Sequence, residues 1–178
     1  MDNSRQEKIR LLSRQNSGRA ATPSFLAELS EALGESIEAA ALQSLPETDL
    51  LLQASREGYQ AATQRGAVSY RRFFLATERA SVLQVADCLA AQLPTEKVFF
   101  LTKLSSICGA VRVNASVLLA HTASIIRLDG DSLSAISSDA TQGVLIDHNP
   151  DDPPQAYEVV VWGDRWSPLG FSCDQTGK

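Results

Sequence analysis

The stretch Tyr157-Glu158-Val159-Val160-Val161-Trp162 decides the fold that this sequence predicts. Alternate side chains of a strand point to opposite faces of a sheet, and here both sets include apolar residues. A strand with two apolar faces is typical of the interior of a sheet, so we expect a central strand. Trp162 and the nearby Trp166 are expected to anchor the core, although tryptophan is also common at binding hot spots.

Shorter apolar runs earlier in the chain predict the remaining strands. These runs are rich in strand-forming residues, and Gly, Pro, Asn and Asp separate them, as in hairpins. Residues 70–75 fit either a short strand or the end of a helix. The other predicted strands are residues 98–101, 109–113, 133–137 and 144–147.

The first half of the chain is predicted to be helical. Thr22-Pro23-Ser24 combines an N-cap with a proline at the first helical position, so a helix should run from there to Gly34. A separate helix over residues 5–15 is expected to end at Asn16-Ser17-Gly18. The amino-terminal region should therefore contain two helices.

A capping box predicts the next helix. Ser44-Leu45-Pro46-Glu47 has the spacing at which the Ser and Glu side chains each bond a free backbone amide. The helix should cover residues 46–64, with Leu50 and Leu51 facing inward. Two further helices are expected, one capped by Ser81 and stopped by Pro94, the other running from Asn114 through His121 to near Asp129.

Together these elements predict an α+β protein with a single domain over residues 1–178. Its helical part covers residues 1–66, a helix-plus-sheet part covers residues 67–166, and residues 167–178 are expected to fray. The sheet should be mainly antiparallel, with about four to six strands. The simplest topology is a meander that helices cover on one side.

Composition places the chain among globular proteins. Of its 178 residues, 44% are hydrophobic and 21% are charged, which argues against a disordered chain. The polar start Met1–Lys8 lacks the pattern of a secretory signal, and the apolar runs are too short to span a bilayer. We therefore expect a cytoplasmic protein without a membrane partner.

The three cysteines, Cys88, Cys108 and Cys173, are widely spaced. Their number and spacing fit neither a disulfide framework nor a metal knuckle. Cys88 is expected to be a small core residue. Cys108, which precedes Gly109, has the only setting that leaves room for chemistry.

Acidic residues are concentrated in the last fifty residues. Residues 1–79 carry ten basic and ten acidic residues, whereas residues 129–178 carry two basic and nine acidic ones, within a net charge of −5 for the chain. Such a balance argues against nucleic acid as a partner, because phosphate binding needs clustered Lys and Arg. A basic protein is the better electrostatic match.

Sequence motifs for catalysis or cofactor binding are missing. The chain has no phosphate-binding glycine loop, zinc-hydrolase motif, nucleophile elbow or CxxC pair, so we expect no cofactor and assign no catalytic residue. His121 falls on an apolar helix face, where a structural histidine is expected, and His148 falls in a loop. The aspartates lack the spacing of an EF-hand, so turns rather than a metal site are expected around them.

The segment Val161-Trp162-Gly163-Asp164 ends the decisive strand of an acidic, cysteine-poor α+β chain. In these features, mainly over residues 98–166, the chain resembles immunity proteins of contact-dependent growth inhibition and other polymorphic toxin systems. The resemblance implies a protein that binds and neutralises a cognate toxin, frequently a basic nuclease.

Three functional hypotheses follow. The first is a non-enzymatic protein that binds a basic toxin through an acidic surface. The second is a small enzyme or ligand-binding domain with a pocket near His121, Cys108 and Arg112. The third is a regulatory or structural subunit that docks through apolar faces at residues 25–33 and 50–62. The acidic surface of the first hypothesis would draw on Asp129, Asp131, Asp139, Asp147, Asp151, Asp152, Glu158 and Asp164.

Overall fold

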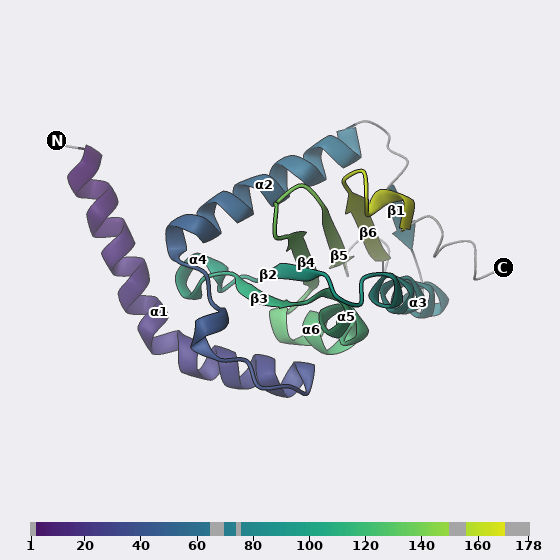
Figure 1. Ribbon diagram of the computed structural model, residues 1–178, viewed down its shortest axis with the longest axis horizontal. Helices are drawn as coiled ribbons and strands as arrows, with labels where there is room; N and C mark the ends of the chain where they lie inside the picture. Colours follow the sequence, from purple (N-terminus) through teal and green to yellow (C-terminus); the bar gives the residue numbers. More distant parts are fainter. Residues whose placement is uncertain (1–2, 65–69, 74–75, 150–155, 170–178) are drawn as a thin grey trace.

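Six antiparallel strands form one sheet in the computed structural model, which describes residues 3–64, 70–73, 76–149 and 156–169. The strands are β1 (Tyr70–Phe73), β2 (Lys97–Leu101), β3 (Val111–Asn114), β4 (Ser132–Ser137), β5 (Gly143–Asn149) and β6 (Ala156–Trp162). Their order is β1-β6-β5-β4-β2-β3 (Figure 1). The consecutive strands β4, β5 and β6 form the expected meander, and β6 has a neighbour on each side, as predicted.

Helices cover both faces of this sheet (Figure 1). The α+β class, the helical first part and the antiparallel sheet are confirmed, but the second covered face was not expected. The helices are α1 (Asn3–Leu33), α2 (Leu45–Gln64), α3 (Ala76–Gln92), α4 (Ser105–Cys108), α5 (Ala115–Ala120) and α6 (Thr122–Asp129), with a short 3-10 helix, η1 (Ala39–Ala41). The helix α2 covers one face, and the other helices pack in the main core on the opposite face.

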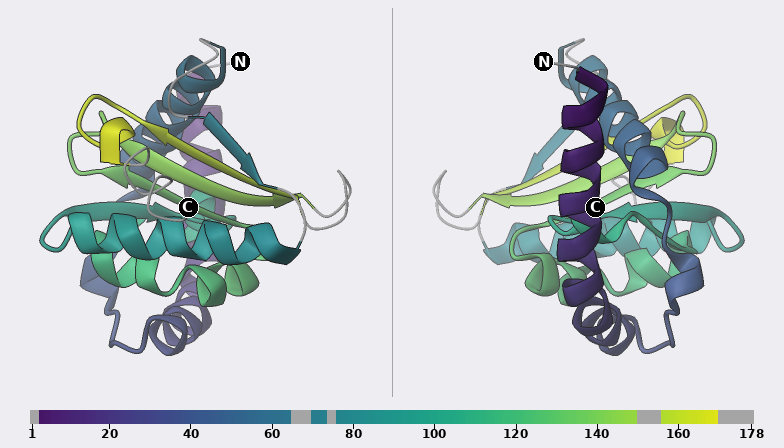
Figure 2. Two further views of the ribbon diagram at one scale, coloured as in Figure 1. Left: turned by 90° about the vertical axis from the view of Figure 1, so that its right-hand side faces the viewer. Right: turned by 90° about the vertical axis from the view of Figure 1, so that its left-hand side faces the viewer.

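The side chains of β6 show which helices lie on which face. Tyr157, Val159 and Val161 belong to the larger core, together with buried residues of α1, α3, α5 and α6. Val160 and Trp162 point the other way and belong to a cluster that includes α2. The two apolar faces of this strand are therefore explained by two helical layers, which Figure 2 shows from the side.

Both tryptophans are core residues, as predicted: Trp162 is 5% exposed and Trp166 is 2% exposed. The indole of Trp162 lies between Gly58 of α2 and Gly143 of β5. A Cβ atom at these glycines would lie only 2.2 Å and 2.0 Å from the ring. Glycine is therefore required at both positions by close contact rather than by backbone conformation.

The amino-terminal region forms one long helix, α1, where two helices were predicted. It continues through Gly18 and Pro23, and Figure 1 shows that its direction changes along its length, as proline in a helix causes. At Gly18 a Cβ atom would lie 2.0 Å from the carbonyl oxygen of Ile107, so glycine permits α1 to approach α4. The expected helix break and the N-cap at Thr22 are therefore wrong.

The predicted capping box and the helix after it are confirmed. The Ser44 N–H donates to Glu47 Oε2 at 3.2 Å, and the Glu47 N–H donates to Ser44 Oγ at 3.4 Å. Leu51 is buried as expected, but the side chain of Leu50 is 68% exposed because it lies on the flank of α2. The prediction that Leu50 faces inward is therefore wrong.

Several boundaries differ from the prediction. Residues 70–75 contain the strand β1, and α3 begins at Ala76, before the predicted cap at Ser81. The helix expected after Asn114 is divided at His121 into α5 and α6. Side-chain bonds to the preceding carbonyls compete with helix continuation there.

Three further expectations concern single residues or short segments. Cys88 is half-buried and packs against the main core, close to the expectation, but it is disulfide-bonded, which sequence spacing did not predict because it does not show which residues meet in the fold. Leu169 lies in a helical turn after Trp166 and contacts the main core, so the chain is ordered up to there. Residues 167–178 were expected to fray, and residues 170–178 of this tail lie outside the described residues.

Candidate functional site

The end of α6 and the start of β4 bring two predicted acidic residues to one lysine. Gly130 ends α6 in the left-handed conformation (φ 97°), and its N–H donates to the Ile126 carbonyl at 3.0 Å. The backbone N–H of Lys103 donates to Asp129 Oδ1 at 2.9 Å. Its Nζ lies 3.4 Å from Asp131 Oδ2. Lys103 therefore joins both carboxylates.

The two carboxylates differ in environment. Burial raises the pKa of Asp129 above its ordinary value, while the hydrogen bond from the Lys103 backbone and the charge of Lys103 oppose this shift. The side chain of Asp131 is 51% exposed. Asp131 is therefore open to a further cation from solvent, and Asp129 is held against the protein.

Asp147 extends this acidic group across the sheet. It lies on β5 opposite Ser132, the residue that follows Asp131, and its other neighbour in the sheet is Glu158 of β6. Asp147 is half-buried. The side chain of Glu158 is outside the described part of the structure. We call Asp129, Asp131 and Asp147 the acidic end of the sheet.

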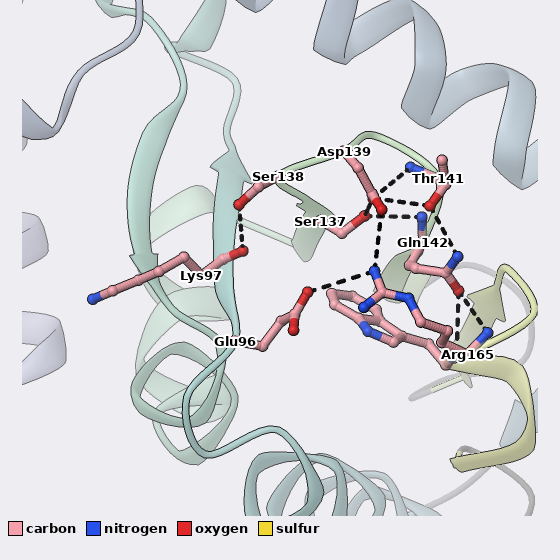
Figure 3. A network of polar contacts seen from close by, with 9 residues as sticks. Glu96, Lys97, Ser137, Ser138, Asp139, Thr141, Gln142 and Arg165 are labelled. Carbon is pink, nitrogen blue, oxygen red and sulfur yellow. Dashed lines mark hydrogen bonds and ion pairs between the residues drawn. The ribbon is translucent and has the colours of Figure 1, made fainter.

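Asp139 lies at the opposite end of β4 and β5, in the turn that joins them. Its Oδ1 accepts hydrogen bonds from Ser137 Oγ at 2.5 Å and from Thr141 Oγ1 at 2.8 Å, and its Oδ2 is 3.2 Å from the Arg165 guanidinium (Figure 3). The bond from Ser137 and the bonds from Thr141 lower the pKa of Asp139 to about 2. Asp139 therefore stabilises its own turn.

Gln142 links the same turn to the chain that follows β6. It is 5% exposed, and its Oε1 accepts hydrogen bonds from the backbone N–H groups of Arg165 at 2.9 Å and Trp166 at 3.2 Å (Figure 3). Its Nε2 donates to Thr141 Oγ1 at 2.9 Å. This network positions Trp166 in the core, which is a structural role.

The structure therefore divides the predicted acidic residues between two places. The acidic end holds three of them, and Asp139 and the exposed Asp164 lie at the other end of the strands. Arg165 offsets the charge there, since it lies within 3.2 Å of Asp139 and 3.7 Å of Glu96. Asp151 and Asp152, expected at a hairpin tip, lie outside the described residues.

The polar groups of the predicted pocket do not converge. His121 lies between α5 and α6, with its Nδ1 2.9 Å from the Val117 carbonyl, and Cys108 is buried in the main core. Arg112 is exposed on β3 and points away from the face on which its neighbour Val113 packs. The sheet therefore separates Arg112 from His121.

Metal ligands and membrane-spanning helices are the remaining features of interest in the described residues. Within them, no group of three His, Cys, Asp or Glu side chains is placed to hold a metal ion. None of the helices there is both long and apolar enough to cross a membrane.

A groove that the sequence did not predict lies between α1 and the start of α2. It has a volume of about 510 Å³, and α4 contributes Ile107 and Cys108 to its wall. Arg14 joins the three helices beside it, because its guanidinium donates two 2.8 Å bonds to Asp49 of α2 and one 2.6 Å bond to the Ser106 carbonyl of α4. The bond with Arg14 lowers the pKa of Asp49. These contacts join residues that are far apart in sequence.

The fold and these surfaces define an α+β protein with polar surfaces at the ends of an antiparallel sheet. The chain belongs to the YokC prophage protein family, whose sequence pattern matches residues 1–160. No curated protein and no solved structure gives a match.

Proposed function

We propose that the protein is a non-enzymatic binding protein that neutralises a protein toxin, and that a cationic surface of the toxin binds at the acidic end of the sheet. The observation that carries the proposal is that Asp129, at the end of α6, and Asp131, just before β4, both contact Lys103, while Asp147 of β5 is paired with the next residue, Ser132. Membership of a prophage family is consistent with this role. The separation of His121 from Arg112 favours binding over catalysis.

The chemistry of the acidic end fits a basic partner. Asp131 already holds Lys103 Nζ at 3.4 Å at an exposed position, so an arginine or lysine of the toxin can replace this weak contact. Gathered carboxylates also attract a cationic partner over longer distances and raise its association rate at low salt. The acidic end would thus occupy cationic groups that the toxin otherwise uses on an anionic substrate.

The test is co-expression with the products of the genes on either side. We expect one of them to be toxic alone, harmless in the presence of this protein, and recovered with it as a complex that forms more slowly at high salt. Harmless neighbours, or a toxic neighbour that remains toxic and unbound, would contradict the proposal.

A double variant and a matched control test whether the toxin binds at the acidic end of the sheet. Asp131→Asn combined with Asp147→Asn should slow association severalfold at low salt. Asp164→Asn is the matched control, because it removes one exposed carboxylate at the other end of the strands and should leave the association rate nearly unchanged. Equal rates for all three proteins would exclude the acidic end as the binding surface.

A further inference from the structure

The first half of α1 carries an exposed face that the fold leaves uncovered. Ile9 and Leu12 are 57% and 58% exposed, although both are large and apolar. They lie three residues apart and share a helix face with Arg5, Lys8 and Arg19, which are also exposed. Arg14 points to the opposite side of the helix, toward α2 and α4. We call these five residues, Arg5, Lys8, Ile9, Leu12 and Arg19, the α1 stripe.

Three of the five residues of the α1 stripe are cations. Within the described part of the chain, Arg5, Lys8 and Arg19 form no ion pair. Residues 3–23 contain five basic residues and one acidic residue. An occupant of this stripe must therefore offer carboxylates around an apolar centre.

Such a surface exists on α2 of the same protein. Leu50 is 68% exposed, and Glu47 and Glu57 lie on its side of the helix, three residues before it and seven after it. Beside Leu50 is a surface depression of about 260 Å³, which Leu51 and Phe99 help to line. We call Glu47, Leu50 and Glu57 the α2 stripe.

We propose that the protein self-associates by docking the α1 stripe of one copy on the α2 stripe of a second copy. Ile9 and Leu12 then contact Leu50 and enter the depression beside it, while the cations of α1 face Glu47 and Glu57. An apolar centre with a charged rim is the usual anatomy of a protein interface. On both helices, exposed residues of the stripe are three, four or seven positions apart, which is the spacing through which one helix packs on another.

A second copy fits better than the other anionic surfaces. Nucleic acid offers phosphates but leaves Ile9 and Leu12 without an apolar partner. In helices that lie in a membrane surface, the cations are segregated from the apolar face, whereas here Arg5 and Lys8 share that face. Direct pairing of two α1 stripes would bring cations together. The contact therefore joins two different surfaces and builds either a closed ring or an open chain.

The mass of the protein in solution tests this proposal. Sedimentation over a concentration range up to about 1 mM should show species larger than the monomer. Their fraction should fall in about 1 M salt, where charges are screened within about 3 Å. Leu12→Ser should weaken association about tenfold or more, because a buried leucine is lost from the interface. A monomer at all concentrations would overturn the proposal.

Charge reversal distinguishes this contact from any other. Lys8→Glu and Glu57→Lys should each weaken self-association, and mixing the two variants should restore it, because each supplies the surface that the other lacks. Glu35→Lys is the control, since Glu35 is exposed and outside both stripes. Unfolding curves of all variants report whether they fold. If the charge reversals leave self-association unchanged, or if the mixture of the two variants remains monomeric, the proposed contact between the α1 stripe and the α2 stripe is wrong.

Discussion

The buried amide of Gln142 is expected to contribute more to stability than any other side chain of its turn. Gln142→Met keeps the approximate volume but removes the Oε1 acceptor of the Arg165 and Trp166 backbone N–H groups. A buried N–H group without a partner costs about 1–3 kcal/mol, so two should cost about 2–5 kcal/mol of unfolding free energy. In a chain of this length, that loss lowers the melting temperature by about 5–15 °C.

Denaturant unfolding of matched variants measures this loss. Thr141→Val is the comparison, because it removes the partner of Gln142 Nε2 and the hydroxyl that donates to Asp139 Oδ1, but leaves both bonds to Gln142 Oε1 in place. We expect this variant to lose about 1–2 kcal/mol, as for two ordinary hydrogen bonds. The reasoning fails if Gln142→Met is no less stable than Thr141→Val. A normal midpoint for Gln142→Met would mean that Trp166 keeps its place without the amide.

Two further predictions concern stability. The pKa of Asp139 is about 2 in the folded protein against an ordinary 3.8, so its stabilisation is present above pH 3.8 and is lost as the pH falls toward 2. Asp139→Asn should therefore be less stable at neutral pH and approach the wild type in acid. Denaturant unfolding measures the difference in stability between Asp139→Asn and the wild type. The same difference at neutral pH and near pH 2 would refute this prediction. Gly18→Ala should destabilise the protein by about 1–2 kcal/mol, because overpacking against the Ile107 carbonyl outweighs the gain of about 1 kcal/mol in helix propensity. The exposed neighbour Ser17→Ala serves as the comparison, and a Gly18→Ala protein of equal or greater stability would show that α1 moves freely on α4.

Local patterns predicted those parts of the fold that depend on local physics. The alternation in β6 identified a central strand, and the Ser44 and Glu47 spacing identified the start of α2, because both signals lie within a few residues. Gly18 and Pro23 led to the wrong prediction of two helices, because contacts between residues distant in sequence decide the structure there. The glycine is present for the contact with Ile107, which is 89 residues away in sequence, and tertiary contacts outweigh the propensity of both residues to end a helix.

The candidate site was predictable in composition but not in arrangement. The excess of acid after residue 128 is visible in the sequence, and it is the reason why acidic residues there are candidates for a binding surface. Which carboxylates meet depends on strand register, which places Asp147 beside Ser132 and leaves Asp139 at the far end. Lys103 gave no local signal, since it joins Asp131 only after β2 and β4 have paired.

Hydrogen–deuterium exchange of the protein, alone and in complex with the toxic product of a neighbouring gene, tests the central claim most directly. The account predicts slower exchange in the complex at residues 129–134 and 144–147, where the acidic end would be covered, with little change at residues 138–142. Protection elsewhere with unchanged exchange at the acidic end would contradict it.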